Sequence, residues 1–294
     1  MKKGHRENTV GPWAEHKLEA LEKYLAFYTT ALKNQSFQLV YIDAFAGTPR
    51  SRVRTPENAP EPSPFLDDPE SAEAQERYIE GSPLRALKFH RHFARYHFFD
   101  LDESRAGTLR ELCETYPQVE VEVGNCNPLV RERAGSLRNR NIRGVAFLDP
   151  YGAHVEWETL EALASTGTME VIINFPVAMA INRLITRSGD IPETWTDQLN
   201  RCFGTPEWRE VAYHRERDLF GEEIITKHGD VSRKLLELYV ERLRNLFPHI
   251  ATPRLIRNTR NAPLYYLIWA GPNPLGLRGA DYILSQGEKV KTAR

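Results

Sequence analysis

Apolar positions recur with two different periods, and their alternation outlines an α/β protein. Residues 18–32 repeat leucine and tyrosine at steps of three and four, which is typical of a helix with one apolar face. The run 38–43 lacks polar alternation and ends in a glycine turn, as expected of a strand covered on both faces. After a helix that begins at Gly81-Ser82-Pro83, with Ser82 as its cap, short apolar runs alternate with helical stretches. The further strands expected are 96–100, 119–123, 145–149 and 170–175, and the helices between them are 103–116, 127–138 and 156–165.

This alternation predicts βαβ units and a parallel sheet. Near the C-terminus, the runs 264–270 and 281–284 leave no room for a crossover helix, so we expect them to pair as antiparallel strands. The predicted fold is therefore a doubly wound, mostly parallel seven-stranded α/β sheet with an antiparallel last strand. By analogy this is the Rossmann-like sheet of class I methyltransferases, and such an analogy does not by itself establish function.

The same pattern predicts how the chain is divided. We expect residues 1–36 to form an N-terminal helix packed on the core, and 37–177 with 263–290 to form the sheet domain. Residues 178–262 read as a mostly helical insertion that serves as a substrate or partner module, or as a lid. Prolines and acidic residues make 48–80 a long loop, which either closes over a site or is a surface insertion.

Composition narrows the class of protein. Apolar residues make up 41% of the 294 residues, which excludes wholesale disorder. No apolar run approaches the roughly 20 residues of a membrane span, and the start of the chain lacks an apolar secretory segment. The three cysteines have neither disulfide nor metal spacing. We therefore expect a cytoplasmic protein with no membrane association.

Charge is nearly balanced, with 39 basic and 40 acidic residues, so nucleic-acid binding must rest on local patches. One candidate patch is the arginine series between 131 and 143, which also reads as a solvated helix face. The other candidate patch lies in the loop beside the expected site and consists of Arg50, Arg52 and Arg54.

Histidines 90, 92 and 97 lack the spacing of metal ligands, so we expect surface or edge residues and no metal site.

Polar residues follow each predicted parallel strand at the edge where open sheets bind ligands. Caps and turns use the same residue types, but a recurrence at five consecutive strand ends favours a binding site. The chain has a single glycine after the first strand and no GxxxxGK[ST] segment, so a pyrophosphate or triphosphate lacks its cradle. S-adenosylmethionine has no phosphate and suits acidic and amide groups. The strand-end residues are Asp43, Ala46, Gly47, Asp100, Asp102, Asn125, Asn127, Asp149 and Asn174.

Asp149-Pro150-Tyr151-Gly152 is the most informative short motif. The lone pair of an exocyclic base amine is delocalised into the ring, so the amine is a poor nucleophile. A carboxylate or carbonyl that accepts its hydrogens shifts density onto nitrogen, while an aromatic face holds the base in line with the methyl group. Asp149, the Pro150 carbonyl and Tyr151 provide these parts, although Asp149 also suits a helix cap and Tyr151 a packing residue.

An ordered set of motifs spanning residues 12 to 285 resembles the three-Cys-motif partner proteins. The resemblance implies a class I S-adenosylmethionine-dependent methyltransferase and a partner of the radical-type Gp37/Gp68-like group that carries the clustered cysteines. It also implies that Asp43, Ala46 and Gly47 border the methionine moiety, that Asp100 or Asp102 binds the ribose, and that Asn125 lies by adenine. The motifs are His16-Lys-Leu, Val40-Tyr-Ile-Asp-Ala-Phe-Ala-Gly47, Gly81-Ser-Pro83, Phe99-Asp-Leu-Asp102, Gly124-Asn-Cys-Asn127, Phe147-Leu-Asp-Pro-Tyr-Gly152, Trp157-x-Thr-Leu160, Ile173-Asn-Phe-Pro176 and Leu264-Tyr-Tyr-Leu267.

The sequence therefore predicts a methyltransferase acting on an exocyclic amine in DNA or RNA, with Asp149, Pro150, Tyr151 and Asn174 at the acceptor and Asn127 among the cofactor residues. The Asp-Pro-Tyr segment resembles both adenine-N6 and guanine-N2 enzymes, so the acceptor atom stays open. Two further classes also stay open: a non-catalytic binding module for the radical-type partner, and a nicotinamide-dependent oxidoreductase.

Overall fold

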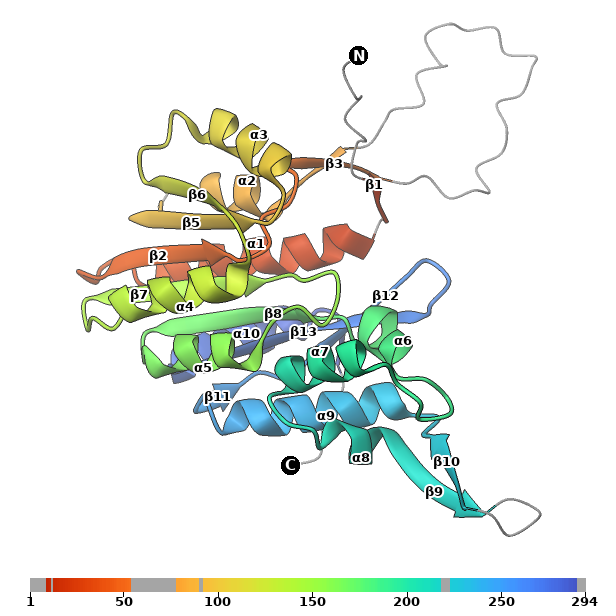
Figure 1. The fold of residues 1–294 in the computed structure, drawn as a ribbon. Helices are drawn as coiled ribbons and strands as arrows, with labels where there is room; N and C mark the ends of the chain where they lie inside the picture. Colours follow the sequence, from red (N-terminus) through yellow and green to blue (C-terminus); the bar gives the residue numbers. More distant parts are fainter. Residues whose placement is uncertain (1–8, 12, 54–77, 90–91, 218–222, 290–294) are drawn as a thin grey trace, which may run out of the picture.

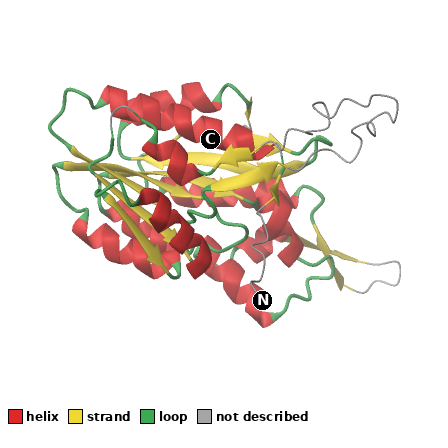
Figure 2. Cartoon of the chain, turned by 90° about the horizontal axis from the view of Figure 1, so that it is seen from above, coloured by secondary structure: helices red, strands yellow, loops and turns green. Residues whose placement is uncertain are grey.

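A single mixed sheet with helices on both faces forms the body of the protein (Figures 1 and 2). A computed structural model describes residues 9–11, 13–53, 78–89, 92–217 and 223–289. Seven main strands run from one edge of the sheet to the other, and the two-residue strands β14 (Glu288–Lys289) and β11 (His249–Ile250) extend it. The main strands are β6 (Val119–Val123), β5 (Arg95–Asp100), β2 (Gln38–Asp43), β7 (Ile142–Leu148), β8 (Met169–Phe175), β13 (Pro263–Gly271) and β12 (Arg254–Arg257).

The first five of these strands are parallel, and β13 pairs antiparallel with both β8 and β12. This order and direction make up the sheet of class I methyltransferases, which confirms the predicted fold class. Strand β8 is buried along its whole length, including its two polar residues Glu170 and Asn174, as expected of a strand covered on both faces.

Two apolar clusters hold the helices against the sheet. On one face, leucines and tyrosines of α1 pack with α2, α3 and α10. On the other face, α4 and α5 pack with α7, α8 and α9. The bounds are α1 (Trp13–Ala31), α2 (Ser82–Leu87), α3 (Glu103–Cys113), α4 (Cys126–Ser136), α5 (Trp157–Ser165), α7 (Glu193–Phe203), α8 (Trp208–Ala212), α9 (Val231–Arg244) and α10 (Pro274–Leu284).

The expected strand 281–284 is wrong, because these residues end α10. Asn273 caps this helix by accepting a hydrogen bond from the Leu275 amide at 2.8 Å, and Pro274 occupies its first turn. A Cβ at Gly279 would lie 2.1 Å from the Phe27 ring, so the glycine lets α10 approach α1 closely. On the side of β13 away from β8, the antiparallel partner is instead β12.

The interval 178–262 contributes more than helices. It contains α6 (Asn182–Leu184), α7, α8 and α9, but its strand β12 belongs to the main sheet. Strands β9 (Tyr213–Arg217) and β10 (Glu223–Lys227) pair antiparallel and extend away from the body (Figure 1). The π-helical turn η1 (Val177–Ile181) connects β8 to this interval.

Part of the expected long loop is ordered into a small sheet. Strand β3 (Arg50–Val53) pairs with β1 (Thr9–Val10) and with β4 (Tyr78–Glu80). Arg50 and Arg52 lie on β3, whereas Arg54 and the remainder of the loop fall outside the described residues, as does His90. The cap of α2 is Gly81 rather than Ser82, which lies inside the helix.

Candidate functional site

A cavity of about 590 Å³ lies at the carboxyl ends of β2, β5 and β6. Its volume falls within the range of about 300–1,000 Å³ typical of small-molecule sites. It occurs where open α/β sheets bind ligands, outside the strand ends. The residues that line it are Ala44, Phe45, Gly47, Asp100, Leu101, Arg105, Gly124, Asn125, Cys126, Asn127, Tyr151, Ala153, His154, Glu156, Gln198 and Arg201.

The turn after β2 brings backbone to the cavity. Gly47 has a φ of 65°, a left-handed conformation that glycine adopts without strain, and its amide donates to Asp100 Oδ2 at 2.9 Å. Ala46 is buried on the opposite side, in the cluster formed with α1 and α2. The turn thus joins the ends of β2 and β5.

The Asp100 carboxylate is the central acidic group of the cavity. It accepts hydrogen bonds from the Asp102 amide at 2.8 Å and from Arg105 Nη2 at 2.6 Å, in addition to Gly47. Asp102 lies outside the cavity lining and caps α3 by accepting from the Arg105 amide. Arg105, which also lines the cavity, therefore occupies acceptor positions of the Asp100 carboxylate.

Two asparagines form the wall after β6. Asn125 caps α4, accepting from the Asn127 amide at 3.0 Å. Asn127 donates to the His154 carbonyl at 2.8 Å and accepts from the Glu156 amide and the Thr159 hydroxyl, both at 2.9 Å. Asn127 thus links the start of α4 to the segment that follows β7, and these hydrogen bonds hold this wall of the cavity in place.

The outer wall comes from segments far away in the sequence. Tyr151, with 69% of its surface exposed, reaches the cavity from the segment after β7. Helix α7 contributes Gln198 and Arg201, and Arg201 lies 3.9 Å from Glu156. Neither α7 residue belongs to a recognisable sequence motif, so neither was predicted as a site residue.

A second polar constellation surrounds Asp149. Lys17 Nζ on α1 lies 2.5 Å from Asp149 Oδ2, and Asn174 Nδ2 donates to Asp149 Oδ1 at 2.6 Å. The Lys17 and Asp149 side chains are 13% and 19% exposed, so the ion pair is only partly solvated. Lys17 was not among the predicted site residues, because its partner lies 132 positions away.

Asp43 is fully buried behind this constellation. Burial, followed by the charge of Asp149, raises its pKa to about 7, and hydrogen bonding to the Ser82 hydroxyl opposes the rise. The Tyr41 hydroxyl donates to Asp43 Oδ2 at 3.3 Å. The two carboxyl groups therefore have different environments at the ends of neighbouring strands.

The predicted site residues thus fall into two groups. The cavity brings together Gly47, Asp100, Asn125, Asn127 and Tyr151. The others lie outside its lining: Asp149 contacts Lys17 and Asn174, Asp43 and Ala46 are buried, Pro150 is buried, and Asp102 is a helix cap.

The arginine series that begins on α4 and ends on β7 contacts acidic and carbonyl groups. Arg131 Nη1 lies 2.7 Å from Glu156 Oε2, and Arg133 Nη2 lies 2.7 Å from Glu122 Oε1. Arg143 donates to the Ile142 carbonyl at 2.7 Å. These contacts favour the structural reading of the series over phosphate binding.

Comparison of the fold identifies a similar solved structure. A Legionella pneumophila strain Philadelphia 1 protein of family model DUF519 is similar to this chain, with a TM-score of 0.51 and 15% identity over 97% of this chain and 96% of that one. Spermidine synthase from Thermotoga maritima gives a TM-score of 0.42 with 12% identity, covering 91% of this chain and 62% of the synthase. An S-adenosylmethionine-dependent methyltransferase from Mesorhizobium loti gives 0.36 with 10% identity, covering 86% and 99%. The Legionella protein shares the fold of this chain.

No protein-family model matches the sequence. A tRNA-2-methylthio-N(6)-dimethylallyladenosine synthase from Stutzerimonas stutzeri strain A1501 is 27% identical over 135 residues, which are 46% of this chain. The matched segment spans only 29% of that synthase.

In the described part of the chain, no helix has the length and apolar character needed to cross a membrane.

Proposed function

We propose that this protein is an S-adenosylmethionine-dependent methyltransferase that acts on an exocyclic amine of a nucleic-acid base. The observation that carries the proposal is the pairing of two sites at one edge of the sheet. One is a cavity lined by acid and amide groups, and the other is the Lys17–Asp149–Asn174 constellation beside it.

The residues present fit the cofactor. Asp100 provides a buried carboxylate for the ribose hydroxyls once Arg105, whose side chain is 40% exposed, moves aside. Gly47 allows close approach of backbone, and Asn125 supplies both a donor and an acceptor near adenine. When bound, S-adenosylmethionine supplies an electrophilic methyl group.

The acceptor chemistry belongs to the Asp149 constellation. A carboxylate has about four acceptor positions, so Asp149 retains capacity for an amine hydrogen while held by Lys17 and Asn174. These two contacts hold the carboxylate in one orientation. Tyr151, largely exposed at the cavity, offers an aromatic face against which a flat base stacks.

The proposal of a nucleic-acid substrate rests on the exposed Tyr151 ring and on the Asp149-Pro150-Tyr151 segment. A further support is the curated relative, whose name describes a tRNA-modifying synthase. We also propose membership in the three-Cys-motif partner proteins and association with their radical-type partner, supported by the ordered motifs quoted above.

Calorimetric titration with S-adenosylhomocysteine tests the cofactor site. We expect saturable binding by the full-length protein and its loss in Asp100→Asn, because the amide removes an acceptor charge. Asp190→Asn, an exposed change within 178–262, is the matched control and should bind normally. No binding at millimolar ligand would contradict the proposed cofactor.

Transfer of a labelled methyl group to mixed cellular RNA or DNA tests the acceptor site. Lys17→Met and Asp149→Asn should retain S-adenosylhomocysteine binding but lower the transfer rate by about 100-fold, within the range for general acid–base groups. Binding without transfer by the wild-type protein would instead identify a non-catalytic module. Thermal stabilisation by NAD(H) alone would favour the oxidoreductase.

A further inference from the structure

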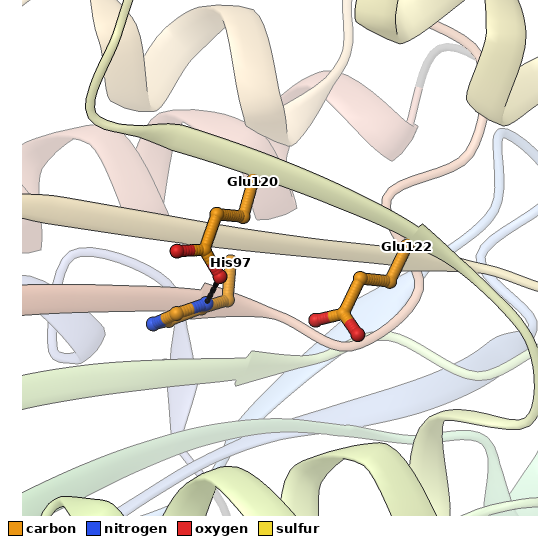
Figure 3. Close-up of side chains that lie close together, drawn as sticks. All are labelled: His97, Glu120 and Glu122. Carbon is orange, nitrogen blue, oxygen red and sulfur yellow. Dashed lines mark ion pairs between the residues drawn. The ribbon is translucent and has the colours of Figure 1, made fainter.

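Three side chains of metal-binding types meet near the outer edge of the sheet. His97 lies on β5, and Glu120 and Glu122 lie on the edge strand β6 (Figure 3). Register pairs His97 with Glu120 and Phe99 with Glu122, so alternation along the strands places all three on one face. Their ligand atoms all lie within 4.8 Å of one another.

The histidine was expected at the surface or an edge, but its side chain is only 5% exposed. Its Nδ1 has no hydrogen-bond partner, and the nearest carboxylate oxygen, Glu120 Oε2, is 3.2 Å away. The imidazole stacks on Phe99 with ring centroids 6.4 Å apart. A buried ring nitrogen that makes no hydrogen bond is costly, and a bound cation would remove that cost.

The donor set suits a divalent transition metal. One imidazole and two carboxylates are ligands of Zn²⁺, whose bonds of about 2.0–2.1 Å place tetrahedral donor atoms roughly 3.3 Å apart. The His97–Glu120 separation already matches this spacing. The glutamate side chains are 52% and 30% exposed, so solvent reaches the cluster and small side-chain movements can close it.

Arginines compete with a cation for the same acids. Arg133 Nη2 lies 2.7 Å from Glu122 Oε1 and 3.6 Å from Glu120 Oε2, and the charge of Arg95 also acts on His97. An ion-pair cluster without metal is the alternative explanation. In that cluster His97 Nδ1 makes no hydrogen bond, however, and each carboxylate retains further acceptor positions.

We propose that His97, Glu120 and Glu122 bind a divalent transition-metal ion of the Zn²⁺ type, with water completing the coordination. The ion would link the edge strand β6 to β5. Because β6 leads directly into Gly124 and Asn125 at the cavity, the metal would stabilise the wall of the proposed cofactor site. The metal site itself does not depend on the proposed methyltransferase activity.

Calorimetric titration of EDTA-treated, dialysed protein with ZnCl₂ tests the site, with Co²⁺ absorption as a second probe of the ligands. We expect one ion per chain and an affinity at least about tenfold lower in Glu120→Gln and His97→Ala, because each removes a ligand. Arg133→Gln should raise the affinity, because it removes the competing cation. Glu120 is half exposed, so its variant tests the site even if His97→Ala fails to fold.

The matched control is His228→Ala. It disrupts the pair His214 and His228, whose ring centroids are 4.4 Å apart and which lies outside the proposed metal site, and it should leave Zn²⁺ binding unchanged. The proposal is overturned by an absence of saturable Zn²⁺ binding, or by binding that survives Glu120→Gln and is lost in His228→Ala.

Discussion

Glu170 shows how a single buried group couples stability to pH. It lies on β8 with 5% of its surface exposed, and the Tyr24 hydroxyl of α1 donates to its Oε2 at 2.5 Å. Burial raises its pKa to about 7, and the Tyr24 hydrogen bond only partly opposes this rise. The folded protein therefore binds this proton more tightly than the unfolded chain, so the associated stability is complete below about pH 4.5 and is lost as pH rises through 7.

Glu170→Gln should remove this pH dependence. The neutral amide cannot ionise, so the variant should gain on the order of 2 kcal/mol in unfolding free energy relative to wild type between pH 5 and pH 8. Urea denaturation at the two pH values measures the difference. Glu111→Gln, on the exposed face of α3, is the control. A constant difference between Glu170→Gln and wild type at both pH values would contradict the assigned pKa.

At the scale of elements, two glycines differ in whether packing requires them. Gly144 lies on β7, between β2 and β8 in the centre of the sheet. A Cβ there would lie 2.7 Å from the Val40 carbonyl oxygen and 2.4 Å from Met169 Sδ. Gly135 lies near the end of α4, and a Cβ there would meet nothing within 4 Å. Close packing of the sheet therefore requires the first glycine, whereas α4 does not require the second.

Alanine substitutions should separate these roles. Gly144→Ala should lower the unfolding free energy by about 2 kcal/mol through overpacking, because the Val40 carbonyl is fixed backbone. Gly135→Ala should raise it by up to about 1 kcal/mol, because glycine is a poor helix former. Chemical denaturation of both variants against wild type measures the change. Equal effects of the two substitutions would contradict the close approach at β7.

At the scale of the whole molecule, the cavity joins segments that lie far apart in the chain. The turn 44–47 and the segment 124–127 come from the sheet domain, while Gln198 and Arg201 come from α7 in the interval 178–262. The α7 helix rests on the core through Leu199, Cys202 and Phe203. The interval 178–262 thus contributes to the cavity wall.

Ligand binding should therefore protect distant segments together. With S-adenosylhomocysteine bound, amide hydrogen exchange should slow in 44–47, 124–127 and 196–203, because contacts in the cavity suppress local opening. The paired strands β9 and β10, which extend away from the body, serve as an internal control and should exchange at unchanged rates. Protection limited to 44–47 would contradict a wall formed by α7.

An element could be predicted from the sequence where its signal lies within a few neighbouring residues, and not where it depends on a distant partner. The strand Val119–Val123 was predicted at its observed bounds, because period-two alternation is read within five residues. The run 281–284 was assigned to a strand, because a run of only four residues fits the periodicity of a strand as well as that of a helix. Packing against α1 decides between the two. Strand β12 was missed, since its Arg-Leu-Ile-Arg sequence reads as a strand only beside β13.

The sequence by itself determined the alternation of parallel strands and helices between 38 and 175, the polar strand ends and the absence of a phosphate cradle, because periodicity, caps and glycine turns act over a few neighbouring residues. Only the tertiary structure decided which polar groups meet. It joined Lys17 to Asp149, placed Arg105 on Asp100, and aligned His97 with two glutamates. These contacts depend on strand register and on helices that cross the sheet, so they form between residues whose separation along the chain carries no periodic signal.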